Sequence, residues 1–260
     1  MDASMWIAKT GLDAQQMRMS VISNNLANVN TTGFKRDRAS FEDMLYQNIR
    51  QPGSQVTADN QSPTGLMLGT GVRLVATEKI HAQGSMVTTK NALDMAITGG
   101  GFFQVAQPDG TIAYTRDGSF KINAEGQIVT ANGQPLEPAI VVPPNASSIA
   151  VGQDGTITVE VPGGGSQVLG QIELARFVNP AGLQSLGQNL MRETAASGAP
   201  VVLAPGTEGA GQIMQGALEA SNVNVVEEMV NMIETQRAYE INSKAISSVD
   251  GMLRFLNNNL

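Results

Sequence analysis

The stretch Met5–Val29, MWIAKTGLDAQQMRMSVISNNLANV, has the apolar spacing of a long helix. Its apolar side chains fall on the a and d sites of four consecutive heptads, and only Gln15 interrupts them. They are Met5, Ala8, Leu12, Met19, Ile22, Leu26 and Val29. Between Ala3 and Asn28 the sequence has no proline and a single glycine, Gly11. We therefore expect one helix of about 26 residues and about 39 Å.

The other end of the chain has a similar design. Asn224 and Glu227 have the spacing of a capping box, with Asn in place of the usual Ser or Thr. An apolar stripe follows, broken by Arg237, and its spacing is nearer about 3.75 than about 3.5 residues. The stripe consists of Val226, Val230, Ile233, Ile241, Ala245, Val249, Met252 and Leu256. It predicts a second helix of about 33 residues.

Strands are expected between these helices. The pairs Asp109-Gly110, Asp117-Gly118, Glu125-Gly126 and Asn132-Gly133 separate short β-prone runs, which favours an antiparallel meander. The runs are residues 101–106, 111–115, 119–123 and 127–130. Further strands are expected at residues 72–80, 149–151, 156–161, 167–177 and 201–203, with a hairpin tip at residues 163–165.

These patterns predict an α+β protein in which the N- and C-terminal helices form a coiled-coil domain, residues 1–33 and 222–260. A central antiparallel all-β domain spans residues 91–185. Extended connectors with some strands, residues 34–90 and 186–221, join the two.

Composition excludes several function classes. The formal charge of −7 gives no basic footprint for nucleic acid and disfavours an anionic membrane surface. No apolar stretch is long enough for a membrane span, so we expect no direct membrane insertion, and no cleaved signal peptide is recognisable. The chain has no cysteine and one histidine, His81, which we expect at a strand edge or facing solvent. We therefore expect no catalytic, cofactor-binding or metal-binding residues.

Two amphipathic helices must bury their apolar stripes. One solution is that both helices pack on the chain's own β-domain. The apolar pattern alone does not favour self-assembly over this packing. A two-helix pair, however, would leave Trp6, Ile7, Met17 and Val21 outside its narrow seam. The second solution is self-assembly, in which neighbouring subunits supply the missing surface. The candidate interface residues are Leu12, Met19, Ile22, Asn25, Leu26, Asn28, Val226, Val230, Ile233, Ile241, Val249, Met252 and Leu256.

Residues Ser23–Lys35, SNNLANVNTTGFK, closely resemble the signature of the flagellar rod, hook and hook-associated protein family. Three further blocks resemble the rod members of that family, and together the resemblance covers essentially the whole chain. They are residues 69–83, 97–117 and 219–260, the last with ETQRAYE at residues 234–240. Within the signature, Gly33 is a candidate left-handed residue at the exit of the first helix. The asparagines satisfy frayed helix carbonyls or, for one or two of them, fix register at a subunit contact.

The resemblance implies a non-enzymatic subunit of the distal part of the rod, which transmits torque from motor to hook. It implies a helical homo-oligomer with the terminal helices in an inner layer, and export through the flagellar type III apparatus without a cleaved signal. The implied partners are the proximal rod proteins, the hook protein, and the peptidoglycan and outer-membrane bushing rings. The implied location is the basal body, from the periplasm to the outer membrane. The alternatives are another axial component (proximal rod or hook-type), or a periplasmic protein that binds or hydrolyses the cell wall.

Overall fold

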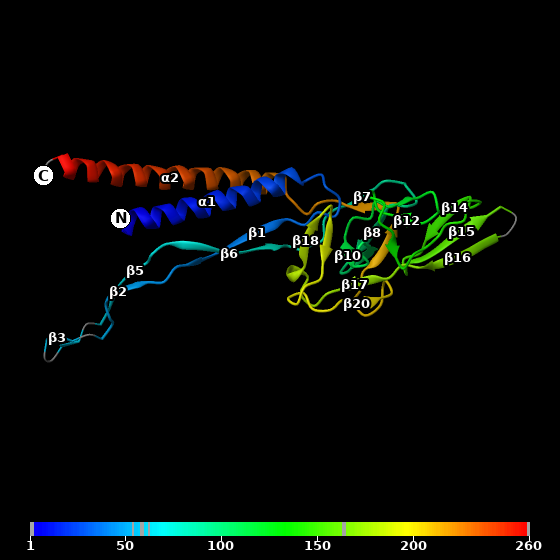
Figure 1. Cartoon of the computed structure of the whole chain (residues 1–260), viewed down its shortest axis with the longest axis horizontal. Coiled ribbons are helices and arrows are strands. Elements are labelled where there is room, and N and C mark those ends of the chain that lie inside the picture. The colour runs from blue at the N-terminus through cyan, green and yellow to red at the C-terminus, as the bar shows by residue number, and fades with distance from the viewer. Residues whose placement is uncertain (1–2, 54, 58–59, 62, 163–164, 259–260) are drawn as a thin grey trace. The chain divides into compact units, whose positions relative to one another are not determined.

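The computed structural model describes the whole chain except residues 1–2, 54, 58–59, 62, 163–164 and 259–260. The chain divides into two compact units (Figure 1). Unit 1 comprises residues 1–26, 37–78 and 224–260, and unit 2 comprises residues 27–36 and 79–223. With a long helix at each end and strands between them, the protein is α+β, as the sequence predicts.

The two predicted helices are present. Helix α1 spans Ala3–Ala27, 25 residues, and α2 spans Val225–Asn258, 34 residues. Asn224 caps α2, because its Oδ1 accepts hydrogen bonds from the backbone N of Val226 at 3.0 Å and of Glu227 at 3.4 Å. The prediction that Asn224 caps the second helix is thus confirmed.

Helices α1 and α2 lie side by side in unit 1 and run in opposite directions (Figure 1). Their contact includes Gly11, where an added Cβ would lie 3.1 Å from Nδ2 of Asn242. On another side of α1, the hydroxyl of Thr10 donates to the carbonyl of Ile7 and accepts from the backbone N of Val72. Helix α1 is therefore contacted both by α2 and by the start of strand β6.

The strands of unit 1 form one ribbon, whose first pair contacts α1 at Asn25 and at Thr10. The pairs are nested, with β1 on β6, β2 on β5 and β3 on β4, so that the chain folds back once. The strands are β1 (Asp37–Asp43), β2 (Gln47–Arg50), β3 (Gln55–Thr57), β4 (Asn60–Gln61), β5 (Leu66–Leu68) and β6 (Val72–Lys79). The expected strand at residues 72–80 is β6.

Unit 2 is built from antiparallel strands in several sheets. The largest has the order β18-β19-β10-β9-β17-β20, with β13 also paired to β9, and a second has the order β14-β15-β16. Three two-stranded sheets, β8–β21, β7–β22 and β11–β12, complete it. The first strands are β7 (Met86–Thr88), β8 (Met95–Thr98), β9 (Phe102–Ala106), β10 (Ile112–Thr115), β11 (Lys121–Ile122), β12 (Ile128–Val129), β13 (Leu136–Glu137) and β14 (Ser148–Val151). There follow β15 (Thr156–Val161), β16 (Gly165–Gln171), β17 (Leu174–Arg176), the 3₁₀ turn η1 (Pro180–Gly182), β18 (Gln184–Gly187), β19 (Leu190–Arg192), β20 (Val201–Leu203), β21 (Gln212–Gln215) and β22 (Ala217–Glu219).

The core of unit 2 is aliphatic with a few aromatic rings. Phe103 and Phe120 are fully buried and meet edge to face, with centroids 5.1 Å apart. Aliphatic side chains from β8, β12, β13, β15, β17 and β21 surround them: Met95, Ile97, Ile128, Leu136, Ile157, Leu174 and Ile213. Because β21 pairs with β8, a segment close to the second helix completes a sheet begun about one hundred residues earlier.

The expected meander is only partly correct. Strands β9 and β10 do form a hairpin, and Gly110, Gly126 and Gly133 have the positive φ that their turns require. Gly118 does not have a positive φ. It follows β10 in a segment that leaves the sheet, and a Cβ added there would meet the carbonyl oxygen of Met95. The run 167–177 is likewise two strands, β16 and β17, in different sheets. Of the hairpin tip expected at residues 163–165, residues 163–164 lie outside the described residues.

Candidate assembly surface and buried charge cluster

Helix α2 exposes most of the apolar stripe that the sequence predicts. The exposed fractions are 69% for Val226, 50% for Val230, 51% for Ile233, 66% for Ile241 and 60% for Met252. Val249 is half-buried, and the side chain of Leu256 lies outside the described residues. A solvated protein gains nothing by exposing such a row along one helix.

The buried positions of α2 are polar. Thr235 is fully buried, Glu228 is 3% exposed, and Asn242 is half-buried. Residues 228, 235 and 242 are spaced by seven and share one face of the helix. The hydroxyl of Thr235 donates to the backbone carbonyl of Asn231, 2.7 Å away, so its burial leaves no hydrogen bond unmade. Helix α2 therefore buries Glu228 and Thr235 most deeply and exposes most of the predicted apolar stripe, while Met232, Ile246 and Val249 are half-buried.

In contrast to those of α2, the candidate interface residues in and just after α1 are buried or half-buried. Ile22 and Asn25 are buried, and Leu12, Met19, Leu26 and Asn28 are half-buried. The exposed apolar side chains of α1 are Trp6, Ile7 and Met17, three of the four that the sequence placed outside a two-helix seam. Val21, the fourth, is half-buried.

Asn25 joins the end of α1 to the first strand of unit 1. Its Nδ2 donates to the carbonyl of Asp37 at 2.9 Å, and its Oδ1 accepts from the Asp37 backbone N at 2.8 Å. The side chain thus pairs with the strand as another strand would. Its neighbour Asn24 contacts the Asp37 carboxylate through its side-chain nitrogen, at 3.4 Å.

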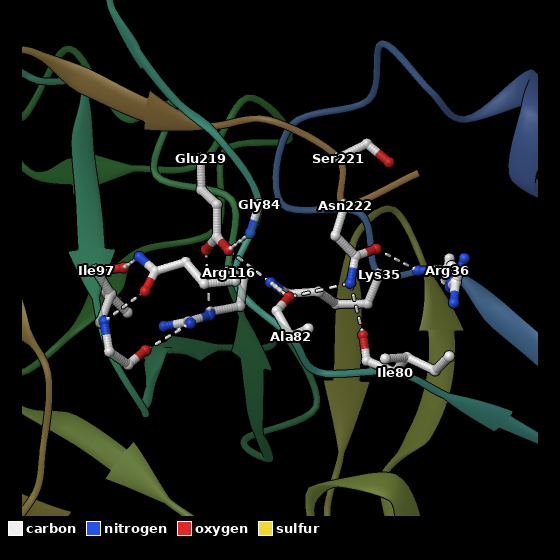
Figure 2. Close-up of polar contacts among 12 residues, drawn as sticks. Lys35, Arg36, Ile80, Ala82, Gly84, Ile97, Arg116, Glu219, Ser221 and Asn222 are labelled. Carbon is white, nitrogen blue, oxygen red and sulfur yellow. Dashed lines mark hydrogen bonds and ion pairs between the residues drawn. The ribbon is translucent and has the colours of Figure 1, made fainter. Parts of the chain in front are cut away.

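Unit 2 contains a cluster of buried charges, Lys35, Arg116 and Glu219 (Figure 2). Nζ of Lys35 lies 2.5 Å from Oε1 of Glu219, and Nε of Arg116 lies 3.3 Å from Oε2 of the same carboxylate. Two cations share one anion in a region closed to solvent. Ions buried this way are stable only if the rest of their hydrogen-bonding capacity is also satisfied.

Backbone groups supply most of the remaining hydrogen bonds. The Arg116 guanidinium donates to the carbonyls of Gly99 at 2.6 Å and Gly101 at 2.9 Å. Lys35 also donates to the carbonyl of Ala82, and the backbone N of Gly84 donates to Glu219. The glycine run at residues 99–101 thus faces the guanidinium with the carbonyls of Gly99 and Gly101.

Asn222 extends this network by three bonds (Figure 2). Its Nδ2 donates to the carbonyls of Ile80 at 2.8 Å and Ala82 at 3.0 Å, and its Oδ1 accepts from the backbone N of Arg36 at 2.8 Å. Residues from three distant parts of the sequence are held at one place. The cluster and Asn222 together fasten the segment after α1 to the segment before α2.

Burial shifts the titration of the cationic groups around the cluster. Desolvation lowers the pKa of Lys35 and of Arg116, against the opposing pull of Glu219. The pKa of His81 falls to about 4, because of desolvation first and then the nearby charges of Lys35, Arg116 and Lys79. His81 is half-buried, with its ring edge-to-face on Phe102. It lies two residues after the end of β6, so of the two positions expected from the sequence, a strand edge or facing solvent, the solvent-facing one is wrong.

The arrangement is structural in character. Each charge of the cluster is held by a countercharge or by backbone groups. Within the described part of the chain, no set of three or more His, Cys, Asp or Glu side chains is grouped to hold a metal ion. In the same residues, no helix has the length and apolar character needed to cross a membrane.

Sequence reasoning missed the charge cluster. Lys35 and Glu219 stand in the quoted blocks, at the end of the signature and the start of the last block, but no spacing rule relates residues so far apart. Isolated Lys, Arg and Glu residues are normally assigned to the surface. The one available signal was that all three lie in blocks of recognisable resemblance.

Three family models match the chain. Residues 5–35 match "Flagella basal body rod protein", residues 96–159 match "Flagellar hook protein FlgE/F/G D1 domain", and residues 214–259 match "Flagellar basal body rod FlgEFG protein C-terminal". The matches include both terminal helices, Lys35, Arg116 and Glu219.

Relatives match over nearly their full length. The flagellar basal-body rod protein FlgG of Buchnera aphidicola is 56% identical over 97% of this chain and 98% of its own. In Caulobacter vibrioides, FlgG is 47% identical over 95% of each chain, whereas the rod protein FlgF is 34% identical over 98% of this chain and 96% of its own. Identity at this level and coverage establishes the family: this chain belongs to the flagellar basal-body rod proteins, which are structural and not enzymatic.

Proposed function

We propose that the chain is the subunit that polymerises into the distal rod of the flagellar basal body and transmits torque from the motor to the hook. Within one organism, Caulobacter vibrioides, the chain is more similar to FlgG than to FlgF, 47% against 34% identity. This difference supports the FlgG-type position over another rod position.

The outward apolar stripe of α2 carries the proposal. Val226, Ile233 and Ile241 would each contribute about 1.5–3 kcal/mol on full burial, and in the single chain they remain half or more exposed. The side chains that α2 buries most deeply in the single chain, Glu228 and Thr235, are polar. A second copy of the chain, presenting exposed α1 residues such as Trp6 and Met17, is the occupant with matching chemistry.

When identical subunits associate through different faces, they form a ring if the rotation between neighbours closes, and a helical filament if it does not. We infer a helical homo-oligomer in which the terminal helices form a coiled-coil layer. Its proposed neighbours are the proximal rod proteins and the hook protein at its two ends, with the peptidoglycan and outer-membrane rings around it. Delivery by the flagellar type III apparatus, without a cleaved signal, belongs to the same proposal.

The test is the double variant Ile233→Ser/Ile241→Ser, with Ile112→Ser/Ile122→Ser as its control. All four isoleucines are exposed, but the control pair lies on strands of unit 2. We expect the α2 variant to raise the concentration needed for polymerisation by at least about 10-fold, since burying the exposed half or more of two isoleucines is worth about 2–3.5 kcal/mol. Sedimentation and electron microscopy measure polymer, and circular dichroism measures monomer unfolding. Equal polymerisation of the α2 variant, the control and wild type would contradict the proposal.

A further inference from the structure

Gly11 is the only glycine of α1, and it lies where α1 meets α2. A glycine inside a helix costs about 0.5–1 kcal/mol relative to alanine, so its position calls for a packing reason. Here the reason is Asn242, whose amide Nδ2 would be 3.1 Å and whose Cγ would be 3.4 Å from a Cβ added at Gly11. A Cβ at residue 11 would therefore press on the amide of Asn242, which would have to shift by a few tenths of an ångström.

This contact fixes the level at which the antiparallel helices pair. Each step forward along α1 is matched by a step back along α2, so Gly11 opposite Asn242 places Arg18 opposite Thr235 and Asn25 opposite Glu228. Burial agrees on the α2 side, where the described side chains of Thr235 and Glu228 are 0% and 3% exposed.

Polar residues in a helix seam select one register. An apolar seam tolerates a slip of one heptad, because one aliphatic layer replaces another, whereas a buried polar residue penalises every register but its own. A slip by seven residues would move Asn242 from Gly11 to the level of Ser4 or of Arg18. Both Ser4 and Arg18 have side chains, so neither leaves room for the Asn242 amide as Gly11 does.

We propose that Gly11 and Asn242 are the register-determining pair of the two terminal helices. Asn242 acts as a positioning residue, because it sets where α1 stands along α2 and thereby where the outward apolar stripe of α2 stands relative to Trp6 and Met17 of the same chain. The consequence for polymerisation rests on the proposed function. The register itself is a property of the single chain.

Engineered cysteines can read the register, since the chain has none of its own. Ala8→Cys with Ile246→Cys, two half-buried positions one turn from the Gly11–Asn242 contact, reports the native level. Ala8→Cys with Tyr239→Cys, or with Leu253→Cys, reports a slip of one heptad in either direction. One heptad is about 10 Å along a helix, and a disulfide needs Cα atoms within about 7 Å, so each pair reports a single register.

The pairs are oxidised in dilute monomer, in wild type, in Asn242→Leu and in Ser243→Leu. Ser243 is exposed on the same helix, so its variant is the matched control. We expect only the native pair to form in wild type and in Ser243→Leu. In Asn242→Leu the slipped pairs should form with yields approaching that of the native pair. Exclusive formation of the native pair in Asn242→Leu would overturn the proposal.

A thermodynamic cycle gives a second, independent measurement that needs no cysteine. Gly11→Ala, Asn242→Ala and the double variant are compared by thermal unfolding. The added Cβ at residue 11 should lower Tm when Asn242 is present and raise it when residue 242 is alanine, because the helix then keeps the propensity gain without the clash. Additive Tm shifts would overturn the proposal.

The two proposals fail separately. If the cross-links follow the expected pattern but wild-type chain forms no polymer, the proposed function fails and the register assignment stands. If Asn242→Leu keeps the native register and wild type polymerises, the register assignment fails alone.

Discussion

Lys35 and Glu219 are 184 positions apart in the sequence, and in unit 2 their side chains form an ion pair with an Nζ–Oε1 distance of 2.5 Å. Both side chains are closed to solvent, at 1% and 0% exposure. Lys35 comes eight residues after the end of α1, and Glu219 six residues before the start of α2. The pair thus joins the two points at which the chain leaves one helix and approaches the other.

Glu219→Gln should strongly destabilise unit 2. It leaves Lys35 and Arg116 buried without an anion, and breaking a buried pair in this way costs about 3–5 kcal/mol. Hydrogen exchange in β7, β8 and β9 measures the change. The control is Glu160→Gln, the same substitution in the same unit at an exposed carboxylate that accepts from Ser148, where we expect less than about 1 kcal/mol. Similar effects of both variants would show that the cluster contributes little.

Gly33→Ala should lower the free energy of unfolding by clearly more than the positive φ of Gly33 alone would explain. Gly33 has φ +67, as expected from the sequence, and an added Cβ would lie 2.7 Å from the backbone C of Arg116. Gly110 has φ +81 with nothing within 4 Å of an added Cβ, so Gly110→Ala isolates the backbone term of about 1–2 kcal/mol. Chemical denaturation should show a clearly larger loss for Gly33→Ala. Equal losses would mean that the contact with Arg116 yields at little cost.

Asn25→Ala tests the clamp between α1 and β1. It removes two hydrogen bonds and leaves the backbone groups of Asp37 without their partner, which should cost about 2–4 kcal/mol in monomer stability. Asn24→Ala, which loses an exposed 3.4 Å contact with the Asp37 carboxylate, should cost less than Asn25→Ala does. If Asn25 also fixes a subunit contact, polymerisation should fall further than monomer stability does. A proportionate loss of both leaves Asn25 with its intrachain role only.

His81 should make unit 2 sensitive to acid. Its pKa is about 4 when folded and about 6.5 when unfolded, so the unfolded chain binds a proton first as pH falls. The His81 contribution is complete above about pH 6.5 and is lost as pH falls toward about 4, by at most about 3 kcal/mol. His81→Phe keeps a ring beside Phe102 and removes the titration. Its unfolding free energy should therefore decline less between these pH values than that of wild type, and an unchanged decline would contradict the assignment.

The sequence by itself determined the two terminal helices, the Asn224 cap, and many of the strands, including β6, β10, β15 and β20. These features depend on local rules, namely the helical period, the side-chain cap and the alternation of β-prone runs with turn glycines. The family was also within reach of the sequence, because Ser23–Lys35 is a contiguous block.

Only the tertiary structure decided which face of α2 is buried. Hydrophobicity alone placed Val226, Ile233 and Ile241 in a seam, yet the single chain buries Glu228 and Thr235. The face that a helix buries depends on the shape and hydrogen bonds of the elements packed against it, as well as on its own hydrophobicity. The strand pairings β7–β22 and β8–β21, and the cluster of Lys35, Arg116 and Glu219, were equally out of reach. They join residues about one hundred or more positions apart, and no local spacing encodes which distant segments meet when the chain closes its core.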